Sequence, residues 1–559
     1  MLRGVLTVGG WTMASRVLGL LRDMLMAALI GTGPVADAFF VANKLPNLFR
    51  RLFGEGAFNA AFVPEFAGLL TAEGPAAAQL FAQEAFAVMA FWLGALTVLG
   101  EIFMPQVMTV FAPGFAHMPA KFALTVELAR ITFPYLMLIC LVALLSGVLN
   151  GMDRFAAAAG APVLYNLFSI AAMLGLTPYV ATVGHATAWG VSASGVVQLA
   201  LLAWAVHRAG MKLKIPRPRL TPHVRLLLRR MAPGLIGASA TQLNQVVDVV
   251  IASLLPAGTV SLLYYADRMQ QLPLGVIGTA VGTALLPLLS RQVRGAEAHE
   301  AIGSLNRAIE YTLFLTLPAA LALAVAGFPM MWVLFGRGAF DTESARLSAQ
   351  ALTAYAVGLP AVVLLKVLTP AFFARGDMAT PVKIGMITLA LNFGLNLLFN
   401  AGIVAPVGAA SWLPRLEHIG PPLATSLAAL FNLGCLGVLL ARRGHLVADA
   451  PMRRRLPRMA LAAGAMAATL WVAQWWLFAP AEHGEAGQGW TGQGGMEHGW
   501  LGHGWRWAAL AALVSLGGGA YLLAGQLFGA FDARDALRLL SRRALRRRDG
   551  SAISPTADP

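Results

Sequence analysis

Apolar stretches of about 20 residues recur along this chain and are separated by short polar or basic segments. A helix needs about that length to cross the roughly 30 Å hydrocarbon core of a bilayer. The pattern therefore predicts an all-α polytopic membrane protein with about fourteen transmembrane helices. Their centres are expected near Leu20, Val41, Leu93, Leu138, Leu167, Val191, Ile236, Leu274, Leu317, Val362, Leu389, Ala429, Ala465 and Leu513.

The chain also contains a weak internal repeat with an offset of about 225 residues. The matches include Asp23 with Asp248, Gly33 with Gly258, Pro134 with Pro360, and the Phe111–Phe115 loop with the Phe335–Phe340 loop. Each repeat would hold six spans, so both repeats enter the membrane from the same side. Parallel repeats of this kind are related by a pseudo-two-fold axis along the membrane normal, with the substrate site between them.

This repeat predicts five parts of the chain. They are an N-terminal six-helix lobe (1–207), a basic cytoplasmic linker (208–230), a second six-helix lobe (231–441), transmembrane helices thirteen and fourteen (442–530) and a basic cytoplasmic tail (531–559).

Composition agrees with a membrane protein, because 58% of the 559 residues are hydrophobic and 12% are charged. The net charge of +15 is concentrated in 208–230, 442–458 and 534–548, whereas 481–504 contains no Lys or Arg. By the positive-inside rule, both termini are expected in the cytoplasm. The basic residues lie between spans without interleaved aromatic residues, which excludes a nucleic-acid partner.

Eight charges interrupt the first two predicted spans. A charge near the bilayer centre costs about 2.5–3.5 kcal/mol, so such residues usually face a water-filled cavity or each other. Five of the eight are basic, which favours a cavity that holds an anion. The eight are Arg16, Arg22, Asp23, Asp37, Lys44, Arg50, Arg51 and Glu55.

The polar residues of the first span share one face. At 100° per residue, Ser15, Arg16, Gly19, Arg22 and Asp23 fall within an arc of about 120°. Glycine on this face leaves room for a ligand. The alternative is that Arg16 or Arg22 pairs with Asp23, or extends to a membrane surface.

In the second span, Arg51 and Glu55 have the i,i+4 spacing of a helix salt bridge, which favours a structural pair. Arg50 points about 100° away, towards Asn47, and is freer to meet a ligand. Pro46 predicts a kink that would rotate one half of this helix against the other.

The second repeat carries fewer charges, with Asp248 in the seventh span and Asp267 and Arg268 in the eighth. Arg268 would project a basic group towards those of the first repeat, with pairing to Asp267 as the alternative. Arginine suits an oxyanion such as phosphate, because its planar fork donates two hydrogen bonds and stays charged.

The motifs around these charges resemble the MurJ (MviN) family of lipid II flippases, in the multidrug/oligosaccharidyl-lipid/polysaccharide exporter superfamily. The motifs are Ser15-Arg16-x-x-Gly19-x-x-Arg22-Asp23, Asp37-Ala38-Phe39, Leu45-Pro46-Asn47-x-x-Arg50-Arg51-x-Phe53-x-Glu55-Gly56-Ala57-Phe58 and Tyr264-Tyr265-Ala266-Asp267-Arg268.

This resemblance implies a monomeric transporter of the bacterial inner membrane, and not an enzyme. It would flip lipid II, an undecaprenyl-diphosphate-linked disaccharide-pentapeptide, to the outer leaflet by alternating access for peptidoglycan biosynthesis. The resemblance assigns substrate contacts to Arg16, Arg22, Arg50 and Arg268, with Ser15, Asp23, Asp37, Asn47 and Glu55 as accompanying polar positions.

Some members of this family bind sodium in the second lobe, which would correspond to Asp248, Asn392, Asn396 and Thr425 here. The third of these is an amide where a carboxylate would bind Na⁺ better. The alternative is a set of buried amides that neighbouring helices satisfy. No other cofactor is expected, and sodium, protons and membrane potential all remain open as the driving force.

Two other functions are compatible with parts of this pattern. A related exporter of drugs or of another lipid-linked glycan would share the fold, although a drug exporter would not need so many arginines. A membrane enzyme acting on a polyprenyl-diphosphate lipid would require a catalytic constellation in an aqueous loop, for which Asp341 and Glu343 are weak candidates. His483, His498 and His503 would suggest a metal site, but a flexible loop is the simpler interpretation.

Overall fold

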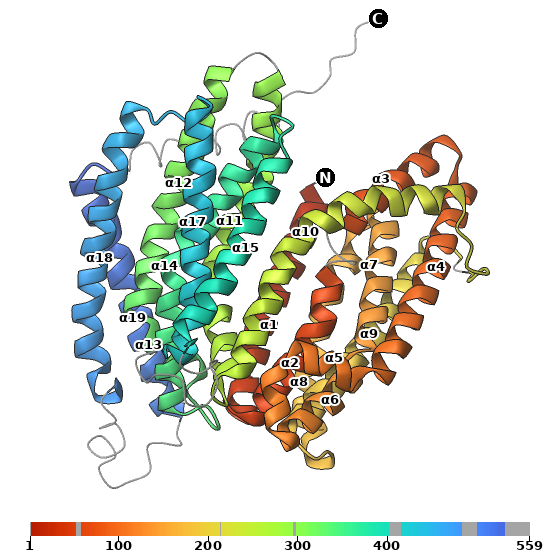
Figure 1. Ribbon diagram of the computed structural model, residues 1–559, viewed down its shortest axis with the longest axis horizontal. Coiled ribbons are helices and arrows are strands. Elements are labelled where there is room, and N and C mark those ends of the chain that lie inside the picture. The colour runs from red at the N-terminus through yellow and green to blue at the C-terminus, as the bar shows by residue number, and fades with distance from the viewer. Residues whose placement is uncertain are drawn as a thin grey trace, which may run out of the picture. The chain divides into compact units, whose positions relative to one another are not determined.

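The computed structural model of the protein describes residues 2–51, 57–212, 214–294, 298–401, 415–482 and 500–530 (Figure 1). These residues form helices and no strands, as the hydrophobic pattern predicts. The α-helices are α1 (Leu2–Ile30), α2 (Pro34–Phe49), α3 (Ala57–Ala72), α4 (Pro75–Ile102), α5 (Met104–Phe111), α6 (Pro119–Thr132), α7 (Tyr135–Gly151), α8 (Phe155–Gly175), α9 (Val183–Arg208), α10 (Pro222–Leu254), α11 (Thr259–Arg294), α12 (Ala298–Val325), α13 (Gly327–Phe335), α14 (Thr342–Phe373), α15 (Ala379–Phe399), α17 (Gly420–Arg442), α18 (Ala450–Glu482) and α19 (Trp500–Leu527). Short 3₁₀ turns cover Pro113–His117, Thr177–Tyr179 and Glu417–Ile419.

Every predicted span centre lies in one of these helices. Ten helices of the described part of the chain are long and apolar enough to cross a membrane. The helices α1, α2, α10 and α11 are not among the ten, and they contain most of the charges that the sequence places in the bilayer. The all-α polytopic fold is therefore confirmed, while the count of fourteen spans stays a prediction.

Proline marks the start of several helices. Pro34, Pro75, Pro119 and Pro222 are the first residues of α2, α4, α6 and α10. The first N–H of a helix has no partner within the helix, so proline loses nothing there, and its fixed φ already suits the helix. These prolines therefore help to set where four of the helices begin.

The chain divides into two compact units that do not follow the sequence repeat. Unit 1 comprises Met1–Arg268, Leu334–Tyr355 and Val382–Ala428, and unit 2 comprises Met269–Val333, Ala356–Pro381 and Ala429–Pro559. The unit boundaries fall inside α11, α13, α14, α15 and α17. The bounds of the two lobes, of the linker and of the tail therefore stay predictions.

Within unit 1, a stack of buried aromatic rings joins α3 to α4. The rings of Phe58 and Phe62 lie 5.1 Å apart, and that of Phe81 lies 5.3 Å from Phe62. α10 begins alongside α3 (Figure 1), where Glu65 forms an ion pair with Arg230 and lies 3.3 Å from His223 Nδ1. This packing fixes the first turns of α10 on the N-terminal helices.

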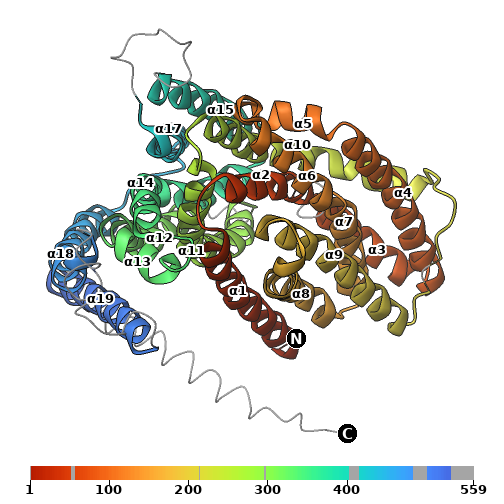
Figure 2. The same cartoon turned by 90° about the horizontal axis from the view of Figure 1, so that it is seen from below.

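Within unit 2, α18 packs against both α12 and α19 (Figure 2). The hydroxyl of Tyr521 on α19 donates to the carbonyl of Phe314 on α12 at 2.7 Å. The buried carboxylate of Glu310 on α12 lies between Arg307 and Arg455. These contacts attach the last two helices to α12 of the same unit.

A carboxyl group in one loop of unit 2 should make the stability of the fold depend on pH. Arg443 and Thr380 donate hydrogen bonds to Asp377, and the Arg443 bond holds the pKa of this carboxyl well below its usual range. A depressed pKa stabilises the fold above the unfolded-state pKa of about 3.9, and this stabilisation is lost as pH falls through the folded-state pKa. We expect Asp377→Asn to lower the Tm at pH 7, and the difference from wild type to shrink below about pH 4.

Thermal unfolding in detergent at pH 7, 5 and 3 measures this difference. Arg443→Gln removes the other partner of the ion pair. Its Tm difference from wild type should also become smaller below about pH 4. A Tm difference that stays constant from pH 7 to pH 3 would contradict the assignment.

Candidate functional site

The polar face predicted for the first span lies on α1, and two of its members are buried side by side. Asp23 is fully buried and Arg22 is 7% exposed. Arg22 donates to Asp23 Oδ1 through Nη2 at 2.7 Å and through Nε at 3.2 Å. The pairing that the sequence left as an alternative for Arg22 is therefore present.

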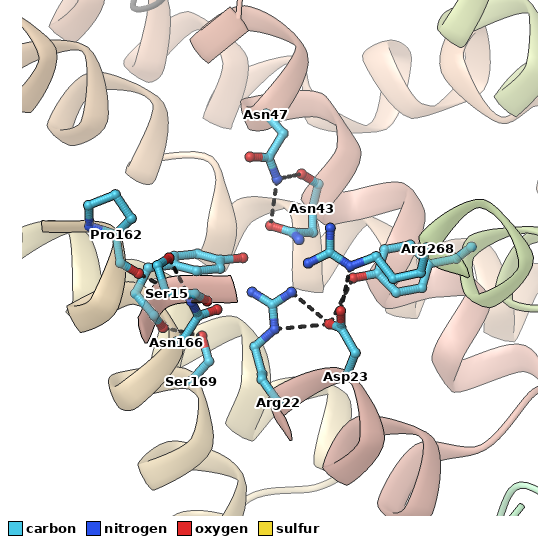
Figure 3. A network of polar contacts seen from close by, with 11 residues as sticks. Ser15, Arg22, Asp23, Asn43, Asn47, Pro162, Asn166, Ser169 and Arg268 are labelled. Atoms are coloured by element: carbon cyan, nitrogen blue, oxygen red, sulfur yellow. Dashed lines mark hydrogen bonds and ion pairs between the residues drawn. The ribbon is translucent and has the colours of Figure 1, made fainter. Parts of the chain in front are cut away.

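Asp23 also joins α1 to α11. Arg268 on α11 donates through Nε to Asp23 Oδ2, and the Tyr264 hydroxyl donates to Asp23 Oδ1 at 3.2 Å. Figure 3 shows the carboxylate between the two guanidinium groups. The structure thus brings Arg268, from the second sequence repeat, next to the charges of the first.

Two residues of α8 complete this cluster, and sequence reasoning missed both. Asn166 donates to the Ser15 carbonyl at 3.0 Å, and the Tyr165 ring lies 5.0 Å from the Arg22 guanidinium carbon. A Cβ on Gly19 would lie 3.7 Å from Asn166 and 3.8 Å from Arg268 Nη2. The available signal was an Asn next to a Tyr inside an apolar span.

The first two residues of the predicted polar face, Ser15 and Arg16, lie outside the buried pair of Arg22 and Asp23. Arg16 is exposed and Ser15 is half-buried. Ser15 reaches the cluster through its contact with Asn166 (Figure 3). Arg16 therefore lies on an open part of the α1 surface.

The C-terminal end of α2 holds a second group of polar residues. Asn47 Nδ2 donates to the Asn43 carbonyl at 2.8 Å, and Arg50 Nε donates to Asn47 Oδ1 at 3.2 Å. Arg51 Nη1 donates to Gln245 Oε1 on α10 at 3.2 Å. Glu55 lies outside the described residues, so the Arg51–Glu55 pair stays a prediction.

The cluster of Arg22, Asp23 and Arg268, which we call the arginine site, combines two cations with one anion. Asp23 uses Arg268 Nε and leaves both terminal nitrogens of Arg268 without a protein hydrogen bond in the described part of the chain. Arginine side chains with uncommitted terminal nitrogens bind phosphate or carboxylate oxygens in pairs. The arginine site is thus suited to an oxyanion.

Asp37 lies in a different environment, although the sequence grouped it with the cavity residues. It is 1% exposed and accepts from Lys121 Nζ at 2.7 Å. It also accepts from the backbone N–H groups of Gly258 and Ser261 at 2.7 and 2.9 Å, and from the Ser261 hydroxyl at 2.9 Å. A carboxylate at this position satisfies the unpaired N–H groups at the start of α11 and favours the helix dipole.

The four hydrogen bonds of Asp37 occupy both of its oxygens. Lys121 is itself buried, with its ammonium 3.9 Å from the centre of the Phe115 ring. Sequence reasoning missed Lys121, whose only signal is a lysine near the start of an apolar span. Asp37 therefore holds α2, α6 and α11 together through these hydrogen bonds.

Backbone contacts close the same end of unit 1. The N–H of Ala339 donates to the Ala28 carbonyl at 2.8 Å, and Thr32 and Ser344 share a hydrogen bond of 2.6 Å. Gly31 and Gly338 have positive φ angles of 65° and 61°, and a Cβ on either would collide with the opposite backbone. We call this region, from Ala28 to Thr32 and from Gly338 to Ser344, the Gly31 end.

The four residues of the predicted sodium set lie in one hydrogen-bonded chain. Thr425 donates to Asp248 Oδ1 at 3.4 Å, and Asn392 donates to Thr425 at 3.1 Å. Asn396 donates to the Asn392 carbonyl at 3.1 Å, and the Asn396 Oδ1 atom is buried without a hydrogen-bond partner. One carboxylate, one hydroxyl and two amide oxygens are donors that a hard cation accepts. The described residues contain no cluster of three or more His, Cys, Asp or Glu side chains.

Comparison with known sequences gives a consistent result. The sequence model of the family described as "Lipid II flippase MurJ" matches residues 26–483. A curated protein of Rhizobium meliloti (strain 1021), named "Probable lipid II flippase MurJ", is 46% identical over 479 residues, which cover 85% of this chain and 87% of that protein.

Solved structures share the fold. The structure titled "Lipid II flippase MurJ, inward closed conformation" has a TM-score of 0.73 and 23% identity, over 95% of this chain and 99% of that one. An inward-facing multidrug resistance MATE family transporter of the MOP superfamily has a TM-score of 0.62 and 15% identity, over 76% of this chain and 95% of that one. At these identities the two structures support the fold alone.

Proposed function

This chain belongs to the lipid II flippase MurJ family, and on that premise we propose that it flips lipid II across the bacterial inner membrane. It is a multi-pass membrane transporter and not an enzyme. The substrate is the undecaprenyl-diphosphate-linked disaccharide-pentapeptide, a precursor of peptidoglycan. We propose that the protein acts as a monomer.

The observation that supports this proposal best is the arginine site. Arg22 and Arg268 come from helices that are far apart in sequence, and Asp23 neutralises only one of their two charges. A diphosphate carries several oxygens that guanidinium groups bind in pairs. We assign its first contacts to Arg268 and Arg22, with Arg50 and Arg16 as further basic groups along α2 and α1.

The Gly31 end supports the alternating-access mechanism. We propose that both termini lie in the cytoplasm, so that α1 ends at the outer side and the Gly31 end is the outer gate. In this orientation, the hydrogen bond between the backbone groups of Ala28 and Ala339 would help to close the protein to the outside. Lipid II would enter from the cytoplasm, and separation of the two segments of the Gly31 end would release its headgroup outside.

Charge gives this cycle a direction. The empty arginine site carries one net positive charge, and a diphosphate with about two negative charges would make the loaded site negative. An inside-negative potential of 100 mV contributes about 2.3 kcal/mol per elementary charge moved. The potential would then favour outward movement of the loaded site and inward return of the empty one. Sodium at Asp248, Asn392, Asn396 and Thr425 is our second proposed coupling force, because these residues offer only oxygen ligands.

Translocation of labelled lipid II in reconstituted vesicles tests the function. We expect Arg268→Ala and Arg22→Ala to reduce flipping by at least about tenfold, since hydrogen bonds to charged groups contribute about 1.5–3 kcal/mol each. Arg346→Ala removes an exposed arginine of α14 that lies outside the site and should leave flipping unchanged.

Two results would overturn parts of the proposal. Normal flipping by folded Arg268→Ala and Arg22→Ala proteins would remove the site assignment. A wild-type protein that fails to flip lipid II but transports another lipid-linked glycan or a drug would remove the substrate.

A further inference from the structure

A pocket of about 730 Å³ opens on unit 1 between α5, α6 and α9. None of the residues of the arginine site lines it. Its walls are mostly apolar, and they also carry one acidic side chain, one basic side chain and one histidine. The residues that matter for its chemistry are Phe122, Val126, Glu127, Arg130, His185 and Trp189.

The pocket lies on the same side of unit 1 as the Gly31 end. α6 and α9 begin here, and Lys121 at the start of α6 contacts Asp37 at the start of α2. Trp189, one and a half turns into α9, is 51% exposed. Partly exposed Trp is typical of the boundary between hydrocarbon and headgroups. The pocket therefore opens at headgroup depth, in the outer leaflet for the orientation proposed above.

Two opposite charges stand one helical turn apart at the rim of the pocket. Glu127 contacts His185 Nε2 at 3.2 Å, and its side chain is 63% exposed. Arg130 is exposed and donates through Nε to the Glu101 carbonyl at 3.2 Å. Within the described residues Glu127 and Arg130 form no ion pair with each other. The negatively charged Glu127, a hydrogen-bond acceptor, and the positively charged Arg130, a hydrogen-bond donor, are therefore both exposed at the rim.

We propose that this pocket binds one phospholipid with a zwitterionic, primary-amine headgroup, such as phosphatidylethanolamine, as a lipid distinct from the transported substrate. Arg130 binds the phosphate, and Glu127 accepts hydrogen bonds from the ammonium. Residues at i and i+3 on a helix are about 5–6 Å apart at Cβ, which suits two charges joined by a two-carbon linker. Phe122, Val126 and Trp189 contact the acyl chains.

The charge pattern discriminates among phospholipids. A phosphatidylglycerol headgroup has no cation, so Glu127 would meet only an anion and repel it. A choline headgroup has a cation but no N–H, so it cannot donate to Glu127. The primary ammonium of ethanolamine satisfies both side chains, because a charge-assisted hydrogen bond is about twice as strong as a neutral one.

Native mass spectrometry of the full chain in detergent, titrated with three phospholipids of identical acyl chains, measures this preference. We expect wild type to bind phosphatidylethanolamine about tenfold more tightly than phosphatidylcholine or phosphatidylglycerol. Glu127→Gln should abolish the preference over phosphatidylcholine, and Arg130→Gln should weaken binding of all three. Ala123→Trp places a large side chain at the exposed Ala123 position of the pocket and should displace the lipid without a change in charge.

A matched pair of control variants is available on α14. Glu343 and Arg346 have the same residue types and the same i,i+3 spacing, and they lie 4.0 Å apart outside the pocket. Glu343→Gln and Arg346→Gln should bind lipids as wild type does. Equal binding of the three lipids by wild type would overturn the proposal, as would an ethanolamine preference that persists in Glu127→Gln or in Ala123→Trp.

Discussion

Asp23→Ala should destabilise the protein by about 3–5 kcal/mol, because it leaves the buried Arg22 without its carboxylate partner. Arg268 loses its ion pair at the same time. Arg268→Ala should cost less, since Asp23 still pairs with Arg22 on the same helix. Thermal unfolding in detergent ranks the two variants, and lipid II flipping should be lost in Asp23→Ala.

A double variant separates charge from packing. Arg22→Leu combined with Asp23→Ala removes the uncompensated charge, and it should recover part of the stability that Asp23→Ala loses. It should not recover flipping, because a guanidinium group of the arginine site is absent. A double variant no more stable than Asp23→Ala would contradict the electrostatic origin of the loss.

Cross-linking of the Gly31 end should stop transport completely. The hydroxyl oxygens of Thr32 and Ser344 lie 2.6 Å apart, so cysteines at the two positions would hold their sulfurs close to disulfide distance. Oxidised Thr32→Cys/Ser344→Cys protein should show no lipid II flipping above the vesicle background, because the gate cannot separate. Reduction should restore it.

The single variants Thr32→Cys and Ser344→Cys serve as controls, and oxidation should leave their flipping unchanged. The native Cys140 is buried, and single variants also report any pairing with Cys140 or Cys435. Wild-type flipping by the fully cross-linked protein would show that the Gly31 end does not open during the cycle.

Hydropathy could predict the helices because each span must satisfy its own backbone in the bilayer. All fourteen predicted centres therefore lie within helices, including Leu20 in the charged α1. Helical periodicity could also place Ser15, Arg22 and Asp23 on one face, since these positions share a single helix.

Partners distant in sequence could not be predicted in this way. Asp37 binds Lys121, 84 residues away, and Ser261, 224 residues away, and no periodicity connects α2 to either. The repeat indicated that Arg268 would face the first half of the chain, but it did not indicate Asp23 as the partner. Such contacts depend on how whole helices pack, and a local pattern does not contain that information.

Residue spacing within one helix also failed to identify the partner that Arg51 has in the structure. The i,i+4 rule paired Arg51 with Glu55, which lies outside the described residues, whereas Arg51 donates to Gln245 on α10. For Asn392, Asn396 and Thr425, the hydrogen bonds match the alternative of buried amides satisfied by neighbouring groups, and sodium binding stays a prediction. The amides bond to neighbouring groups, and Asn396 still retains a buried oxygen without a partner.

The first turns of α11 are held by two carboxylates of the N-terminal helices, Asp37 at the beginning and Asp23 through Tyr264 and Arg268 further on. α11 can separate from α1 and α2 only after both sets of bonds break. We therefore expect these bonds to lengthen the lifetime of the closed arrangement. We expect an opening step that breaks these bonds to have a high activation enthalpy, so that turnover limited by it would rise steeply with temperature.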